Sequence, residues 1–307
     1  MKKLISLLTA AIMAAACLTG CRSAGNPTAA ASAIDTAAAA AATTASVAAT
    51  TEATTVAATT AEPVELIVFA AASMTETLNE IGSMYTAVHP NVTLTFNFDS
   101  SGTLKTQIQE GASCDLFISA GQKQMNQMDK TADAAVNTEG LDLVLQGTRV
   151  NLLENKVVLV VPKSNPKNIK SFDDMAAGLN DGSILMAMGN SDVPVGQYTQ
   201  KILTYYKLDE AALASAGVLS YGTNVKEVTT QVSQGTVDCG VVYYTDALSA
   251  GLTNVAEATR DMCGQAIYPA ALINTTAHKD QTQAFLDYLK TDEAMTIFKN
   301  AGFNAAA

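Results

Sequence analysis

The chain has 307 residues and carries 18 Lys and Arg against 29 Asp and Glu, which gives a formal net charge of −11. A chain this acidic lacks the positive surface that attracts nucleic acids or anionic membranes, so we expect neither as a binding partner. Its two histidines and five cysteines show no spacing typical of a metal cluster. Any site for an anion must act locally, against the overall field of the protein.

Residues 1–20 have the pattern of a bacterial export signal. Lys2 and Lys3 precede an apolar run over 4–17, and the Leu-Thr-Gly-Cys junction at 18–21 is of the lipoprotein type. The run is short for a membrane span, so we expect cleavage before Cys21 and lipid attachment to that cysteine. The mature protein would be anchored to the outer face of the bacterial cell membrane. Its formal charge would be −13, because two lysines leave with the signal.

The segment after the anchor is a predicted tether. Residues 21–62 are rich in Ala, Thr and Ser and lack the large apolar side chains that a folded core requires. The remaining residues, 63–307, are enough for one large domain or for two lobes of ordinary size. The function is therefore expected in 63–307.

Strand-like and helix-like patterns alternate along this part of the chain. This alternation predicts an α/β fold with mainly parallel sheets flanked by helices, in which ligands collect at the carboxyl ends of the strands. The predicted strands cover 66–70, 92–96, 116–119, 157–161, 184–187, 237–243 and 266–273. The predicted helices cover 74–88, 196–206, 225–233 and, as a pair, 279–299.

Four predicted helix starts offer neutral hydrogen-bond donors. A helix N-terminus exposes unpaired N–H groups and a partial positive charge, so several converging starts can bind an anion without lysine or arginine. Ser73 and Glu76 have the spacing of a capping box, as do Asn224 and Glu227, and Pro194 suits the first turn of a helix. The four segments are 69–73, 99–102, 193–198 and 222–227.

Three cysteines lie in the expected folded part. Export permits disulfides, and we predict one between Cys239 and Cys263, because both lie beside strand-like segments in the same half of the chain. Cys114 is predicted to be a buried free thiol.

Five stretches together resemble the substrate-binding proteins of molybdate ABC transporters. The resemblance runs in order from about residue 64 to 303, and its most specific parts are Phe-Ala-Ala-Ala-Ser at 69–73 and Asp-Leu-Phe-Ile-Ser-Ala at 115–120. The five stretches are 68–74, 100–104, 112–120, 193–198 and 240–243.

The resemblance implies which residues hold the oxyanion. Carried over by motif, the contacts are the hydroxyls of Ser73 and Ser101, the backbone amides of Val195 and Val225, and the phenol of Tyr243. The metal of molybdate, or of tungstate, would be held only through its oxygens, with no direct protein ligand. No other cofactor is implied.

The resemblance also implies a two-lobed, periplasmic-binding-protein-like fold of type II with the ligand in the interlobe cleft. One lobe would take 63–151 plus 264–307, and the other 152–263. The protein would be a monomeric receptor rather than an enzyme, and its partner would be an ABC permease in the membrane. Two departures from the family pattern stand out: Gly102 occupies a position where serine is usual, and Val195 is bulkier than the frequent alanine.

Two other functions are compatible with parts of the sequence. Adjacent Tyr243 and Tyr244 could bind ferric ion as paired phenolates, which makes a ferric-ion-binding transport protein the alternative. A serine hydrolase that uses Ser73 would need a Gly-x-Ser-x-Gly turn and a histidine base. The sequence lacks this motif and has only two histidines, which argues against a hydrolase. Lys105, Lys226 and Asp99 lie beside the motifs; we expect the lysines on solvated helix faces.

Overall fold

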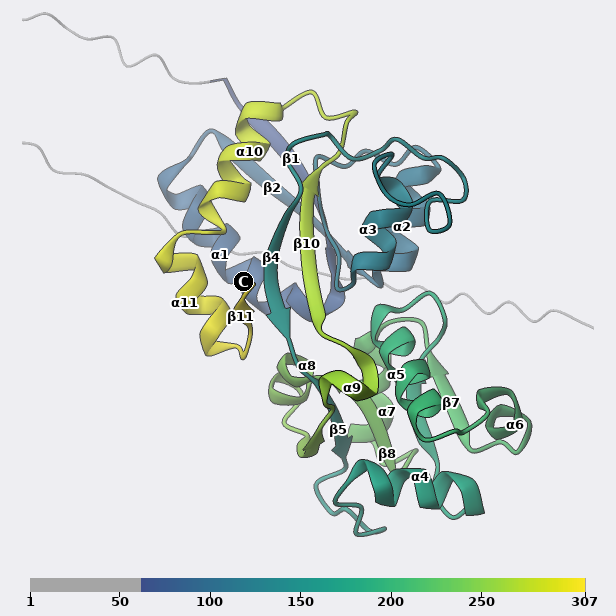
Figure 1. The fold of residues 1–307 in the computed structure, drawn as a ribbon. Helices are drawn as coiled ribbons and strands as arrows, with labels where there is room; N and C mark the ends of the chain where they lie inside the picture. Colours follow the sequence, from purple (N-terminus) through teal and green to yellow (C-terminus); the bar gives the residue numbers. More distant parts are fainter. Residues whose placement is uncertain (1–61, 307) are drawn as a thin grey trace, which may run out of the picture. The chain divides into compact units, whose positions relative to one another are not determined.

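A computed structural model describes residues 62–306 (Figure 1). The predicted signal peptide (1–20), its lipid site Cys21 and the tether up to residue 61 lie outside the described residues. Within residues 62–306, none of the helices combines the length and the apolar character needed to cross a bilayer.

The described chain builds two β-sheets. The six-stranded sheet has the order β11-β4-β10-β3-β1-β2, and the five-stranded sheet has the order β7-β6-β8-β5-β9. The strands of the first sheet are β1 (Val64–Ala71), β2 (Val92–Asp99), β3 (Leu116–Ile118), β4 (Val150–Asn155), β10 (Ala266–Leu272) and β11 (Asn304–Ala305). Those of the second are β5 (Val157–Val161), β6 (Met186–Gly189), β7 (Leu219–Gly222), β8 (Cys239–Tyr243) and β9 (Thr253–Glu257).

Helices flank both sheets. In Figure 1, α1, α10 and α11 lie on one side of the first sheet, and α2 and α3 lie on the other. The helices of this first lobe are the 3₁₀ helix η1 (Ala72–Met74), α1 (Thr75–Val88), α2 (Ser101–Gln109), α3 (Gln122–Met128), α10 (Lys279–Tyr288) and α11 (Asp292–Asn300). Those of the second lobe are α4 (Phe172–Asp181), α5 (Pro194–Tyr205), α6 (Glu210–Ser215), α7 (Val225–Ser233), α8 (Tyr244–Ser249) and α9 (Arg260–Cys263).

The chain passes between the sheets twice. It leaves the first sheet at the end of β4 and enters the second with β5, so Lys156 is the crossing residue. It returns after β9 and α9, when β10 joins the first sheet. The expected boundary between 151 and 152 falls inside β4, because the long segment before β4 obscured where the strand begins. Here, residues 62–155 and 264–306 are the first lobe, and 157–263 the second.

Each sheet is mixed rather than mainly parallel. The cores β3-β1-β2 and β7-β6-β8 are parallel, as predicted. The strands near the crossing are antiparallel to their neighbours: β10 to β3 and β4, and β5 to β8 and β9. The alternation of strand-like and helix-like patterns predicts that strands and helices follow each other. It does not predict the direction of a strand that comes from the other lobe.

Buried side chains explain which strands were predictable. Every residue of β5 is buried, so its sequence is a continuous apolar run. The strands β7 and β9 are only partly buried and lack such a run, which is why neither was predicted. In α1, the buried residues Leu78, Ile81 and Tyr85 share one helix face, and the helix ends just before His89 and Pro90.

The predicted disulfide between Cys239 and Cys263 is not formed. All three cysteines of the described residues are buried free thiols, including Cys114, which was predicted to be one. Cys239 begins β8, whereas Val157 and the nearby α9 lie beside Tyr243 at the strand's other end. Four strand steps span about 13 Å. A disulfide requires Cα atoms about 4.4–6.8 Å apart, so sharing one half of the chain was not enough.

A chain of residues 62–307, prepared without reductant, is expected to show three reactive thiols per molecule after denaturation. In the native state these thiols should react slowly, because burial shields them and raises their pKa values. A thiol titration with and without denaturant measures both. A count of one in denaturant would indicate that Cys239 and Cys263 are joined after all.

Candidate functional site

The two parallel strand cores bring their carboxyl ends to a small cavity between the lobes. The cavity has a volume of about 10 Å³, roughly that needed to hold one water molecule. Four of the five predicted contact residues line it, and the fifth, Val195, directly follows a lining residue. The lining residues are Ala71, Ala72, Ser73, Asp99, Ser100, Ser101, Ala120, Val193, Pro194, Val225 and Tyr243.

Ser73 lies in η1, between β1 and α1, rather than at a helix cap. The predicted capping box with Glu76 is wrong, since Met74 precedes α1 and makes no side-chain cap bond. The Ser73 Oγ instead lies 2.9 Å from the hydroxyl of Tyr268, which belongs to β10. A partner 195 residues away in the sequence therefore replaces the local cap.

Ser101 is the first residue of α2. The helix is capped by Ser100, whose Oγ accepts a hydrogen bond from the amide of Thr103 at 3.2 Å. The Oγ of Ser101 is thus free of the cap, and it accepts a hydrogen bond from the amide of Ala120 at 2.9 Å. The hydroxyl proton of Ser101 remains available to donate.

Val195 and Val225 lie in the first turns of α5 and α7. Pro194 is the first residue of α5, as predicted. The predicted box before α7 is also confirmed: the Asn224 side chain accepts from the Glu227 amide at 3.1 Å, and the Glu227 carboxylate accepts from the preceding loop. N–H groups in these first turns have no acceptor within their own helix.

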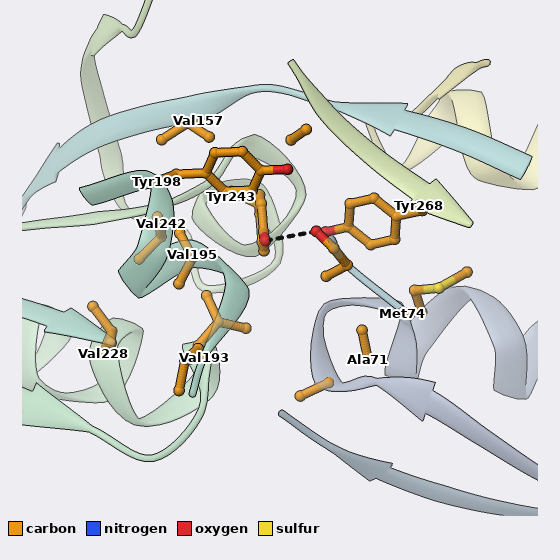
Figure 2. Packing of buried hydrophobic residues seen from close by; sticks show 14 of the residues in the cluster. Ala71, Met74, Val157, Val193, Val195, Tyr198, Val228, Val242, Tyr243 and Tyr268 are labelled. Atoms are coloured by element: carbon orange, nitrogen blue, oxygen red, sulfur yellow. Dashed lines mark hydrogen bonds between the residues drawn. The ribbon is translucent and has the colours of Figure 1, made fainter. Parts of the chain in front are cut away.

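Tyr243 closes the cavity from the end of β8. Its side chain is buried, and its hydroxyl donates to the carbonyl oxygen of Ala120 in the first lobe at 3.1 Å (Figure 2). Burial raises the pKa of this phenol well above its usual value, so it is a neutral donor. Tyr244 turns elsewhere, and its ring packs against Gly302, so the two adjacent phenols do not converge on one point.

Aromatic rings support Tyr243 on both sides. The Tyr198 ring lies 6.3 Å from the Tyr243 ring and the Tyr268 ring lies 5.5 Å away, both in edge-to-face arrangements (Figure 2). Tyr198 and Tyr243 come from the second lobe, whereas Tyr268 comes from the first. These contacts limit where the Tyr243 hydroxyl can point.

The cavity lining contains neither lysine nor arginine. Its one carboxylate, Asp99, accepts a hydrogen bond from the Ser100 amide at 2.7 Å and another from the Asn224 side chain at 3.3 Å. These donors offset its negative charge. The groups of this cavity that can attract an anion are therefore neutral N–H and O–H donors.

Lys226 follows Val225 but does not line the cavity. Contrary to the expectation of a solvated lysine, it bridges the lobes: its Nζ lies 2.8 Å from Glu76 of the first lobe and 3.3 Å from Asp246 of the second. Asp246 is fully buried, and burial raises its pKa to about 6 although Lys226 acts in the opposite direction. Lys105 is not solvated either: 13% of its side chain is exposed, and its Nζ lies 3.6 Å from Glu139.

Sequence reasoning missed three residues of this region. Ala120 contributes both its amide and its carbonyl, and its only signal was its place at the end of the Asp-Leu-Phe-Ile-Ser-Ala stretch. Tyr268 and Asn155, which lies at the end of β4, are joined by a hydrogen bond of 3.2 Å. Neither had a local signal, because both reach the site from the crossing strands.

Comparison with known proteins gives related matches over the same region. Residues 66–304 match the family described as bacterial extracellular solute-binding protein. The chain is 34% identical over 244 residues to YvgL of Bacillus subtilis, named as an ABC transporter substrate-binding lipoprotein, and the match covers 79% of this chain and 87% of that protein. It is 34% identical over 249 residues to the molybdate-binding protein ModA of Escherichia coli, with 79% and 90% covered.

A solved structure agrees in fold. The substrate-binding domain of a molybdenum ABC transporter from Clostridium difficile is 30% identical to this chain, with a TM-score of 0.57. The match covers 80% of this chain and all of that one.

Replacing Asp246 with asparagine is expected to make stability less dependent on pH. The folded-state pKa of about 6 lies above the ordinary value near 4, so the folded protein binds this proton more tightly than the unfolded chain does. Wild-type stability should therefore fall as the pH rises from about 4 to 6 and remain lower above that. Two pKa units correspond to about 3 kcal/mol.

Thermal melts between pH 4 and 8 measure this effect. Asp246→Asn should melt higher than wild type at pH 8, and its advantage should shrink towards pH 4. Glu76→Gln removes the exposed partner of the same lysine and should change stability by less than about 1 kcal/mol. A difference between Asp246→Asn and wild type that stays constant with pH would contradict the account.

Proposed function

Because this chain belongs to the bacterial extracellular solute-binding protein family, we propose that it captures molybdate, or tungstate, and delivers it to an ABC importer. Its relatives ModA and the molybdenum transporter domain support this substrate. The chain is a binding protein rather than an enzyme, since the family binds solutes for transport.

The observation that carries the proposal is the set of neutral donors around the interlobe cavity. Ser73 and Ser101 offer hydroxyls, Val195 and Val225 offer amides, and Tyr243 offers a phenol. A hydrogen bond to a charged partner contributes about 1.5–3 kcal/mol. Five such bonds sum to about 7.5–15 kcal/mol, and micromolar affinity corresponds to roughly 8 kcal/mol, so the upper part of this range leaves an excess for ordering costs.

Ligand binding favours closure because each lobe holds only part of the donor set. The serines belong to the first lobe, and Val195, Val225 and Tyr243 belong to the second. The anion completes its coordination only when the lobes meet, so it stabilises the closed state. The Tyr243 proton, which points to Ala120, turns to the anion in the proposed complex.

A glycine determines how closely the lobes approach. A Cβ atom at Gly102 would overlap the carbonyl oxygen of Asp192 in the second lobe. The serine that the family usually carries at this position would therefore require the Asp192 loop to move. Gly102 supports the proposed closure through its absent side chain.

The proposed location is outside the cytoplasm. The family is extracellular, and we infer that Cys21 carries a lipid that anchors the protein to the outer face of the membrane. The Leu-Thr-Gly-Cys junction at 18–21 supports this inference, as does the relative YvgL, which is named as a lipoprotein. The proposed receptor acts as a monomer, and a membrane permease is its partner.

Calorimetric titration of residues 62–307 tests the substrate. We expect tight binding of molybdate and tungstate and much weaker binding of sulfate and phosphate. Ser73→Ala and Ser101→Ala should each weaken molybdate binding by about 10- to 150-fold, the equivalent of one charged hydrogen bond.

The control for these serine variants is Ser83→Ala. Ser83 is exposed on α1 and bonds only within its own helix, so affinity should not change. Preferred binding of sulfate or phosphate would refute the substrate. A phenolate-to-iron visible band on adding ferric ion would favour the iron-binding alternative at Tyr243 and Tyr244.

Gly102→Ala is expected to weaken molybdate binding at least about 10-fold, because the new methyl group meets the Asp192 backbone before the lobes close. Small-angle scattering should show less compaction on adding molybdate than for wild type. Alanine favours helix more than glycine does, so any loss of stability in the variant would come from the Asp192 contact rather than from the helix. Wild-type affinity in this variant would show that closure does not require the close approach of Gly102 to the Asp192 backbone.

A further inference from the structure

A chain of hydrogen bonds leads from the lobe crossing to the cavity. The Asn155 Nδ2 lies 3.2 Å from the Tyr268 hydroxyl, which lies 2.9 Å from the Ser73 Oγ. All three side chains are buried, and Ser73 is the one that lines the cavity. Asn155 ends β4 and Tyr268 lies in β10, so the chain begins on the two strands nearest the crossing.

The direction of this chain follows from its first member. The Asn155 Oδ1 accepts a hydrogen bond from the Lys156 amide at 2.8 Å, which identifies the opposite side of the carboxamide as the NH₂ group. That group donates to Tyr268 and to the Thr245 hydroxyl of the second lobe, 3.0 Å away.

The hydrogen bond from Asn155 influences the direction of the next bond, between Tyr268 and Ser73. Either hydroxyl can donate in the bond between Tyr268 and Ser73, and the bond that the Tyr268 oxygen accepts from Asn155 favours the Tyr268 proton on the Ser73 side. Ser73 then accepts on its protein side, and its own proton is left for the cavity. Reversing the bond would leave the Tyr268 proton facing an N–H donor.

The Ser101 hydroxyl is also oriented by a protein donor, in this case a backbone amide. Its Oγ accepts from the Ala120 amide, and a backbone N–H cannot reverse its role. Both cavity serines therefore accept from the protein and can donate to a ligand.

We propose that Tyr268 and Asn155 are positioning residues that hold Ser73 as a donor to the bound anion. This inference rests on the proposed function. Neither residue lines the cavity, so each acts through Ser73 rather than by contact. The arrangement favours fully deprotonated anions over hydrogen phosphate. A P–OH group of hydrogen phosphate placed against Ser73 and Ser101 would face donors, and a buried unpaired donor costs about 1–3 kcal/mol.

A double-mutant cycle on molybdate affinity tests the relay. Tyr268→Phe keeps the ring and removes the hydroxyl, and it should weaken molybdate binding about 10-fold. If Tyr268 acts through Ser73, the double variant Tyr268→Phe with Ser73→Ala should bind as Ser73→Ala alone does. Multiplied effects, or an unchanged affinity in Tyr268→Phe, would overturn the proposal.

Tyr198→Phe is the matched control. It also removes a buried phenol hydroxyl, but that hydroxyl donates to the backbone of Gln265 at 3.3 Å and not to Ser73. Any loss in Tyr198→Phe should multiply with that of Ser73→Ala. Asn155→Ala provides a second cycle with Ser73→Ala, which decides the question if Tyr268→Phe does not fold.

Phosphate provides a readout that general destabilisation would not change. In Tyr268→Phe the Ser73 hydroxyl can rotate and accept a proton, so the ratio of molybdate to phosphate affinity should fall. Equal weakening of both anions would refute the positioning role. A wild-type protein that does not bind molybdate would refute the proposed function itself. If the wild type binds molybdate but the effects of Tyr268→Phe and Ser73→Ala multiply, only the positioning role of Tyr268 is refuted.

Discussion

The site depends on two parallel strand cores whose carboxyl ends face each other. In each lobe these ends are followed by short turns and helix starts, which carry amide and hydroxyl donors. The antiparallel strands β4, β5 and β10 connect the lobes and set this orientation. Without that crossing, Ser73 and Val225 would be ordinary residues at the starts of separate helices.

Charge is used differently inside the cavity and around it. The mature chain would be strongly acidic, yet the cavity lining holds no lysine or arginine, and its carboxylate Asp99 accepts hydrogen bonds from the Ser100 amide and the Asn224 side chain. Lys226 lies outside the cavity and joins Glu76 to Asp246 across the lobes. The cation thus joins the lobes, while in the proposed complex fixed dipoles attract the anion.

The sequence predicted those features that depend on neighbouring residues. Pro194 and the pair Asn224 and Glu227 were placed correctly, because capping is decided within one helical turn. Ser73 was misassigned as a cap because its partner, Tyr268, lies in a strand that returns from the other lobe. The pairing of Cys239 with Cys263 failed for the same reason, since neighbourhood in the chain does not report position along a strand.

Selectivity in the proposed site divides into two physical parts. Discrimination against protonated anions depends on the direction of the hydrogen bonds at Ser73 and Ser101, which Asn155 and the Ala120 amide determine from the protein side. Size is tested by how far the lobes can approach, and the backbone contact between Gly102 and Asp192 limits that approach. In the described structure the cavity is already about the size of one water molecule, so sulfate and molybdate would both hold the lobes further apart than here. The larger anion separates them more, and discrimination by size therefore depends on which lobe separation lets all five donors reach the ligand oxygens.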